Sequence, residues 1–165
     1  MNHIRISDCS NLFLRCDESK KLDYMTLDRF IEAQSSVIEE VMAELSAGKK
    51  ETHWMWFIFP QLKVLGRSGT AKFYGLVNLD EARLYLEHPV LGPRLLHCTQ
   101  AVLTHADKTA HKIFGFPDDL KFRSSMTLFM MAKPDQILFN QALTQFYAGE
   151  SDPRTIEVLQ ETGGC

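Results

Sequence analysis

The chain has 165 residues, which suits one compact domain and argues against two. Hydrophobic residues make up 45% and charged residues 24%, as in ordinary globular proteins. A formal net charge of -3 without a basic tail excludes the footprint of a general nucleic-acid binder. No signal-peptide pattern opens the chain, and no apolar run is long enough for a membrane span. We therefore expect a cytoplasmic protein that binds neither nucleic acid nor membrane.

The cysteines are not arranged for metal binding or cross-linking. Cys9, Cys16, Cys98 and Cys165 include no Cys-x-x-Cys pair, so the sequence predicts neither a zinc site nor a disulfide framework. A phosphate-binding glycine loop, a Gly-x-Ser-x-Gly elbow and a His-Glu-x-x-His helix are also missing from the sequence. We therefore predict reduced thiols, no metal site and no cofactor.

Helix signals begin after a weakly patterned start. Residues 1–25 lack periodicity, and we expect an N-terminal extension or irregular cap there, followed by a helical domain over residues 26–165. The first helix is predicted over residues 27–47, because its apolar positions recur at helical spacing and Thr26 can cap it. Gln34 is the one polar interruption of that apolar stripe.

The next segment concentrates the bulkiest side chains of the chain. It contains both tryptophans, Trp54 and Trp56, together with His53 and Gln61, and we expect a short helix that ends at Pro60. Buried indole and imidazole groups need hydrogen-bond partners. The cluster is therefore either the centre of the core or the wall of a pocket.

The remaining helices are predicted from cap signals and apolar periodicity. Asn78 with Glu81 forms an asparagine variant of the capping box. Asp118 and Asp119 follow Pro117, and acidic residues at a helix start interact favourably with the helix dipole. Asp152-Pro153 marks the start of the last helix. The expected ranges are 79–88, 91–105, 119–131, 135–147 and 153–162. Because no segment alternates apolar and polar residues as a strand does, we predict an all-α fold in a single compact multi-helix domain.

The start of the 119–131 helix is the most suggestive candidate for a site. Helical spacing sets Asp118 near Lys121 and Asp119 near Arg123, as surface ion pairs or as part of a ligand site. Serine and threonine have only moderate helix propensity in the interior of a helix. The expected helix nevertheless contains three such residues close together: Ser124, Ser125 and Thr127. We therefore expect part of the segment from Asp118 to Thr127 to bind a ligand.

Two cationic side chains lie at predicted helix ends. Arg94 follows Pro93 just inside a helix start, where backbone N–H groups point outward and an arginine can clamp an anion. A solvated arginine on the helix surface is the alternative. His88 precedes Pro89 at a helix end, where a cation suits the helix dipole.

Several segments between residue 27 and about residue 160 form a recognisable series of motifs: Arg29 through Gln34, His53 through Gln61, Glu81-Ala82 with Tyr85 through Gly92, Phe114-Gly115 with Asp118-Asp119, and Lys121 through Phe129. Together these segments resemble the domain of unknown function family eighteen-ten. The resemblance implies a small, mainly α-helical protein.

A second series of residues, in chain order, is His53, Ala82, Gly92, Arg94, Asp119, Lys121, Met126, Phe139 and Leu143. In the order of these residues the chain is similar, more faintly, to the NADAR family of N-glycosidases, which is named for NAD and ADP-ribose. The glutamate expected before His53 is Thr52 here, and no tryptophan follows Asp119. This similarity implies a ligand pocket and N-glycosidic hydrolysis.

We predict an aromatic-rich pocket for a small nucleotide-like or ADP-ribosyl ligand. In an N-glycosidase-like hydrolase, Asp119 would stabilise the cationic sugar of the transition state. Trp54 or Trp56 would stack on a ring, and the other ligand-binding residues would be His53, Gln61, Arg94, Lys121, Arg123, Ser124, Ser125 and Thr127. The alternative is a non-catalytic helical interaction module in which the tryptophan-rich segment is core.

Overall fold

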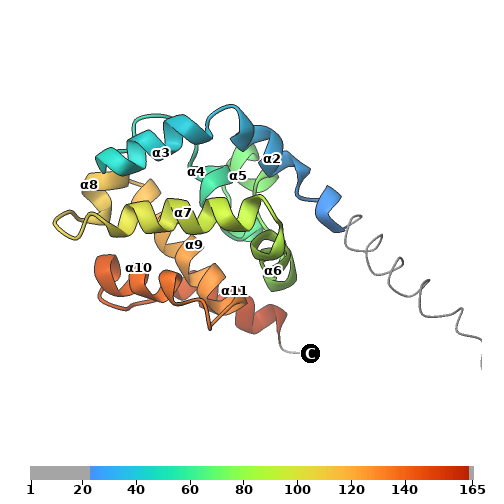
Figure 1. Cartoon of the computed structure of the whole chain (residues 1–165). Helices are drawn as coiled ribbons and strands as arrows, with labels where there is room; N and C mark the ends of the chain where they lie inside the picture. Colours follow the sequence, from blue (N-terminus) through green and yellow to red (C-terminus); the bar gives the residue numbers. More distant parts are fainter. Residues whose placement is uncertain (1–22, 164–165) are drawn as a thin grey trace, which may run out of the picture.

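A computed structural model describes residues 23–163, which fold into helices joined by short loops (Figure 1). In this part of the chain the only β-type pairing is an isolated parallel bridge between Leu62 and Leu76. The predicted all-α class is therefore confirmed. Most of the expected extension at residues 1–25 lies outside the described residues, as do Cys9, Cys16 and Cys165.

The helices cover most of the described chain. They are α2 (Asp28–Ser35), α3 (Ile38–Ala47), α4 (Met55–Ile58), the 3-10 helix η1 (Lys63–Leu65), α5 (Gly69–Phe73), α6 (Leu79–Glu87), α7 (Leu91–Leu103), α8 (Ala110–Phe114), α9 (Asp118–Ala132), α10 (Ile137–Tyr147) and α11 (Pro153–Thr162). The predicted helices from residue 79 onward match α6, α7, α9, α10 and α11 within about two residues at each end. None of the helices within residues 23–163 has both the length and the apolar character needed to cross a bilayer.

The helix predicted over residues 27–47 is two helices, α2 and α3, so that prediction was wrong in detail. The break falls at Ser36 and Val37, where the Ser35 hydroxyl donates to the carbonyl of Ile31 and competes with regular helix bonding. Thr26 is not a cap, because its hydroxyl donates to the carbonyl of Asp23. The predicted stop after α3 is confirmed by the left-handed backbone of the following glycine, with φ of 68°.

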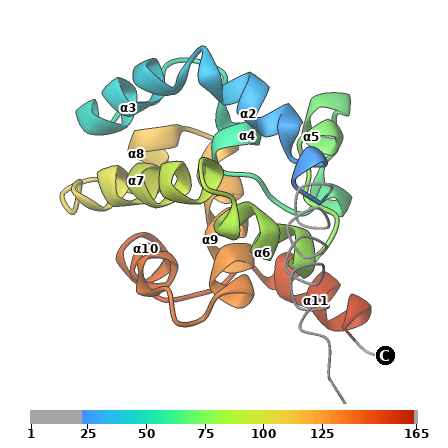
Figure 2. The same ribbon diagram turned by 45° about the vertical axis from the view of Figure 1, so that its right-hand side comes forward.

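α9 is the central helix of the fold. It contacts α6, α8, α10 and α11 (Figure 1, Figure 2). Its side chains from Ser124 to Phe129 are all buried. A helix buried on several sides tolerates hydroxyls only when their hydrogen bonds are satisfied. The Thr127 hydroxyl donates to the carbonyl of Arg123 at 2.9 Å. The Ser124 hydroxyl has two acceptors for its one proton, the carbonyl of Leu120 at 3.1 Å and the Asp152 carboxylate at 3.0 Å.

Aromatic rings join α9 to the tryptophan-rich segment. The ring centroid of Phe122 lies 4.9 Å from that of Phe59 and 4.7 Å from that of Phe114. Trp54 is 1% exposed, and its ring lies 6.2 Å from that of Phe59. Such pairs contribute about 0.5–1.5 kcal/mol each beyond the area that they bury. The core therefore contains much of the aromatic side-chain volume of the tryptophan-rich segment.

Gln34 is a buried hydrogen-bond centre between four helices. Its Nε2 atom donates to the carbonyl of Phe57 at 2.7 Å and to the Tyr85 hydroxyl oxygen at 2.9 Å, and Arg94 Nη1 lies 3.4 Å from its Oε1 atom. Burial raises the pKa of the Tyr85 hydroxyl far above its ordinary value, so the phenol stays neutral. The polar interruption in the α2 stripe therefore fixes α2 against α4, α6 and α7.

The corner between α6 and α7 depends on a neutral histidine. His88 is buried, and its Nδ1 atom accepts hydrogen bonds from the backbone N–H groups of Val90 and Leu91, at 3.1 Å and 3.3 Å. Burial is the main cause that lowers the pKa of His88. The prediction of a cation at the end of α6 was therefore wrong: the ring serves the start of α7 as an acceptor.

Candidate functional site

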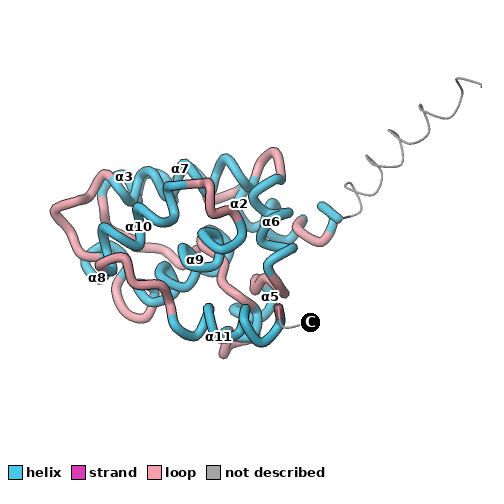
Figure 3. Tube along the Cα trace, turned by 90° about the horizontal axis from the view of Figure 1, so that it is seen from below, coloured by secondary structure: helices cyan, strands magenta, loops and turns pink. Residues whose placement is uncertain are grey.

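A cavity of about 560 Å³ lies between α4, α5 and the N-terminal ends of α9 and α11. Residues of α5 and of α11, which are far apart in the sequence, both line this cavity. Figure 3 labels the two helices below α9 in that view. The cavity lining includes five of the predicted site residues: Trp56, Gln61, Lys121, Arg123 and Ser124. The structure therefore brings part of the tryptophan-rich segment together with part of α9.

Lys121 lies over the face of Trp56 at the edge of this cavity. Its Nζ atom is 5.2 Å from the centroid of the indole ring and 3.1 Å from Asp118 Oδ1, as the helical spacing predicted. The same carboxylate binds Lys50, whose Nζ atom lies 2.9 Å from Oδ2. Two lysines share one carboxylate, so this cluster carries a net positive charge beside the cavity.

Arg123 does not pair with Asp119, which corrects the second predicted ion pair. Its guanidinium lies 3.3 Å from the carboxylate of Glu150 and donates to the carbonyls of Glu150 and Ser151, each at 3.0 Å. Asp119 faces the other way, with Oδ2 3.1 Å from His111 Nδ1. Helical spacing made the two side chains neighbours, but carbonyls of the loop before α11 offer the guanidinium several acceptors at once.

Arg67 and Arg154 line the same cavity and are exposed. Within residues 23–163 neither side chain takes part in a hydrogen bond or an ion pair. Sequence reasoning missed both. Arg67 lies between Gly66 and Gly69 in a segment without periodicity, and Arg154 follows the Asp152-Pro153 signal, which indicated only a helix start.

Asp152 is the one carboxylate that lines the cavity. Its Oδ2 atom caps α11 by accepting from the N–H and the hydroxyl of Thr155, at 3.1 Å and 2.6 Å, and from the Ser124 hydroxyl at 3.0 Å. The Thr127 hydroxyl oxygen accepts from the N–H of Asp152 at 2.8 Å. Two of the predicted hydroxyls therefore position Asp152. The third, Ser125 Oγ, is buried without a partner among the described residues.

Trp54 belongs to the core and not to the cavity. Its indole N–H donates to Glu44 Oε2 at 2.8 Å, and the same carboxylate accepts from the Thr52 hydroxyl at 2.6 Å and from the N–H of Glu51 at 2.8 Å. Burial raises the pKa of Glu44, but the hydrogen bonds from these groups outweigh it and hold the pKa below its ordinary value. Of the two predicted stacking residues, Trp56 is the one that lines the cavity.

Three further predicted site residues lie outside the cavity lining: His53, Arg94 and Asp119. His53 is exposed on the loop before α4. Arg94 is half-buried on α7 and donates to Gln34. Asp119 lies at the start of α9 but faces His111 on α8. The structure therefore does not place these three side chains in the lining of the cavity that Trp56 shares.

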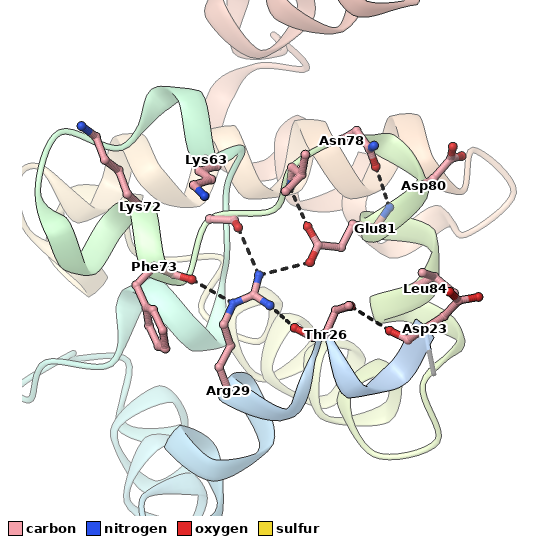
Figure 4. A pocket seen from close by; sticks show the side chains of 12 residues that line it. Asp23, Thr26, Arg29, Lys63, Lys72, Phe73, Asn78, Asp80, Glu81 and Leu84 are labelled. Atoms are coloured by element: carbon pink, nitrogen blue, oxygen red, sulfur yellow. Dashed lines mark hydrogen bonds and ion pairs between the residues drawn. The ribbon is translucent and has the colours of Figure 1, made fainter. Parts of the chain in front are cut away.

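A second cavity of about 560 Å³ surrounds Arg29 (Figure 4). The Arg29 guanidinium donates to the carbonyls of Phe73 and Gly75, at 2.8 Å and 3.2 Å, and to that of Thr26, and it pairs with Glu81 at 3.1 Å. Sticks in Figure 4 show these groups converging on the one side chain. The guanidinium of Arg29 already has hydrogen-bond and ion-pair partners on several sides. We therefore assign Arg29 a structural role, in which it joins α2 to α5 and α6.

The comparison with known proteins identifies the family. The sequence matches the family described as "Protein of unknown function (DUF1810)" over residues 24–159. The chain belongs to this family. The DUF1810 chain is also similar to a solved structure, the conserved hypothetical protein Rv1873 from Mycobacterium tuberculosis, with 48% identity and a TM-score of 0.80. That similarity covers 81% of this chain and 95% of the other. None of the curated proteins matches the sequence.

The described part of this DUF1810 protein contains no group of three or more His, Cys, Asp or Glu side chains placed to hold a metal ion. Cys98, the cysteine that falls within it, is free and buried, and burial raises the pKa of its thiol to about 12. Such a thiol remains protonated and is a poor nucleophile. The candidate chemistry therefore lies with the cations, the indole and the carboxylate of the α5–α9–α11 cavity.

Proposed function

We propose that the cavity between α5, α9 and α11 binds a nucleotide-like or ADP-ribosyl ligand, in which a flat ring is joined to at least one phosphate. The observation that carries this proposal is the pair of guanidinium groups, Arg67 and Arg154, which share the cavity with the Trp56 ring and have no partner within residues 23–163. Guanidinium groups bind phosphate through short, charge-assisted and often bidentate hydrogen bonds.

The apolar side of the cavity fits the ring of such a ligand. Phe116 and Leu120 line it and are 75% and 51% exposed, which is unusual for side chains of this size. A ligand ring that covers them would remove apolar surface from water, at about 25 cal/mol per Å². Trp56 offers a further aromatic face. Apolar walls with a few converging polar groups are typical of small-molecule sites.

Lys121 and Arg123 support the same ligand more weakly than the two free arginines. Each already has a carboxylate partner, Asp118 for Lys121 and Glu150 for Arg123. A charge that is paired in the free protein gains less from an incoming phosphate than an unpaired one. We therefore assign the main phosphate contacts to Arg67 and Arg154.

Binding is proposed ahead of hydrolysis. An N-glycosidase needs a carboxylate that faces the cationic sugar of the transition state, and Asp119, which faces His111, does not line the cavity. A hydrolase built on this cavity would have to use Asp152. The release of nicotinamide from NAD, or of base from nucleosides, measures this activity directly.

Isothermal titration calorimetry with ADP, ADP-ribose, NAD and adenosine tests the proposal. We expect saturable binding of the phosphorylated ligands and at least about tenfold weaker binding of adenosine, because a lost charged hydrogen bond costs roughly 1.5–3 kcal/mol. Arg67→Gln and Arg154→Gln should each weaken ADP-ribose binding by about 10- to 100-fold.

Lys72→Gln is the matched control, because Lys72 is an exposed cation that lines the second cavity. The Lys72→Gln variant should bind ADP-ribose with the same affinity as the parent protein. Equal losses in the Lys72 and Arg67 variants would contradict a site at the α5–α9–α11 cavity. Absence of binding with all four compounds would favour the non-catalytic interaction module.

A further inference from the structure

We propose that Asp152 makes the α5–α9–α11 cavity selective for a sugar: its free carboxylate oxygen accepts a hydrogen bond from a ribosyl hydroxyl that lies beside the phosphate. This inference rests on the proposed ligand site and names the part of the ligand that the cations do not recognise. It makes Asp152 a specificity-determining residue.

The two oxygens of Asp152 are used unequally. Oδ2 accepts three hydrogen bonds, from the N–H and the hydroxyl of Thr155 and from the hydroxyl of Ser124. Oδ1 accepts none from the part of the chain that the structure describes, and none of the cations lining the cavity forms an ion pair with it. One oxygen is thus committed to α11, and the other is available to a ligand.

Capping does not require a negative charge at this position, although the helix dipole modestly favours one. Asn and Ser cap helices about as well as Asp does, and a neutral cap would place no carboxylate beside the phosphate of the ligand. Because like charges repel, Asp152 lowers the affinity of the cavity for a simple anion. A carboxylate is favoured here if the ligand also carries a hydrogen-bond donor, and the hydroxyls of a sugar phosphate are such donors.

The carboxylate is also held in a defined position. The Thr127 hydroxyl oxygen accepts from the N–H of Asp152, and the Ser124 hydroxyl donates to its side chain. Both hydroxyls belong to the buried face of α9, with Ser124 8% and Thr127 0% exposed. Rigid support of this kind is what a selective polar contact requires, since little entropy is then lost on binding. The N-terminus of α11 is itself closed by Asp152, so it is not the phosphate site.

The parent protein provides the first test, through a comparison of ADP, 2′,3′-dideoxy-ADP and inorganic pyrophosphate by calorimetry. We expect removal of the two ribosyl hydroxyls to weaken binding by about tenfold. Equal affinities for ADP and its dideoxy analogue would overturn the inference and leave the proposed phosphate site intact. If neither ADP nor pyrophosphate binds, the proposed function fails together with it.

Asp152→Asn provides the second test. The cap requires an oxygen toward Thr155, so the amide must direct its NH₂ group toward the cavity, which exchanges an acceptor for a donor and removes the charge. Pyrophosphate should bind several-fold more tightly, and the preference for ADP over dideoxy-ADP should fall, because a ribosyl hydroxyl that accepts from a neutral amide loses the stronger bond to a charged group. An unchanged preference would overturn the inference.

Ser124→Ala is the companion variant, since it keeps the charge of Asp152 and removes one hydrogen bond that positions it. It should reduce the preference for ADP over its dideoxy analogue. If the Asn variant does not fold, this variant still decides: a full preference for ADP in Ser124→Ala would contradict the role given to Asp152.

Discussion

Trp54 and Trp56 lie two positions apart and have different roles. Two residues correspond to about 200° around a helix, so the side chains point to nearly opposite sides. Trp54 points into the core, where its indole N–H binds Glu44, and Trp56 points to the cavity, where Lys121 lies over its ring. The sequence indicated that this segment was important but left open which indole faced a ligand.

We expect Trp54→Phe to destabilise the fold by about 1–3 kcal/mol, because the buried Glu44 carboxylate loses a hydrogen-bond donor. Trp56→Phe keeps an aromatic face for Lys121 and should cost less than about 1 kcal/mol. The midpoints of urea unfolding measure both changes. Equal losses in the two variants would contradict the division of roles between the tryptophans.

The corner between α6 and α7 should make stability depend on pH. The pKa of His88 is lowered in the folded protein from its ordinary 6.5, so on acidification the unfolded chain takes up the proton first. The stability linked to His88 is therefore complete above about pH 6.5 and is lost as the pH falls below it. His88→Asn retains an acceptor for the start of α7 and does not titrate. The stability difference between parent and variant should thus shrink from about pH 7.5 to about pH 5.5; a constant or growing difference would refute this account.

The same corner brings α7 against α6 without room for a side chain. A Cβ atom on Gly92 would lie 2.1 Å from the carbonyl oxygen of Leu86, whereas one on Gly69 would meet nothing within 4 Å. Gly92→Ala should therefore destabilise the protein by about 1–3 kcal/mol or more. Gly69→Ala, the control, should be neutral or stabilising by up to about 1 kcal/mol. Thermal or urea unfolding compares the two; a harmless Gly92→Ala would show that the corner can open.

The helices that could be predicted are those with local signals. Caps at Asn78 and Asp152, together with apolar periodicity, placed α6 and α11, and both caps are formed by the expected side chains. α5 and α8, with five residues each, are too short to show a periodic pattern. The break between α2 and α3 was missed because the apolar stripe continues across it.

The site could be predicted only in part, because four separate segments meet in it. Its α4 and α9 contributions stood out as unusual clusters of Trp, Lys, Arg and Ser. The contributions of Arg67 and of Asp152 with Arg154 depend on how α5 and α11 pack, and no local pattern encodes that. Net charge was no guide either: the whole chain carries -3, while four cations and one carboxylate line the cavity.

The indole N–H resonances test the central claim most directly. The chain contains two tryptophans, so a ¹⁵N-labelled sample gives two indole signals, which Trp54→Phe and Trp56→Phe assign. On titration with ADP-ribose, the Trp56 signal should shift and saturate, and the Trp54 signal, which belongs to the core, should stay in place. A Trp56 signal that does not move at millimolar ADP-ribose, or a shift confined to Trp54, would contradict a ligand site between α5, α9 and α11.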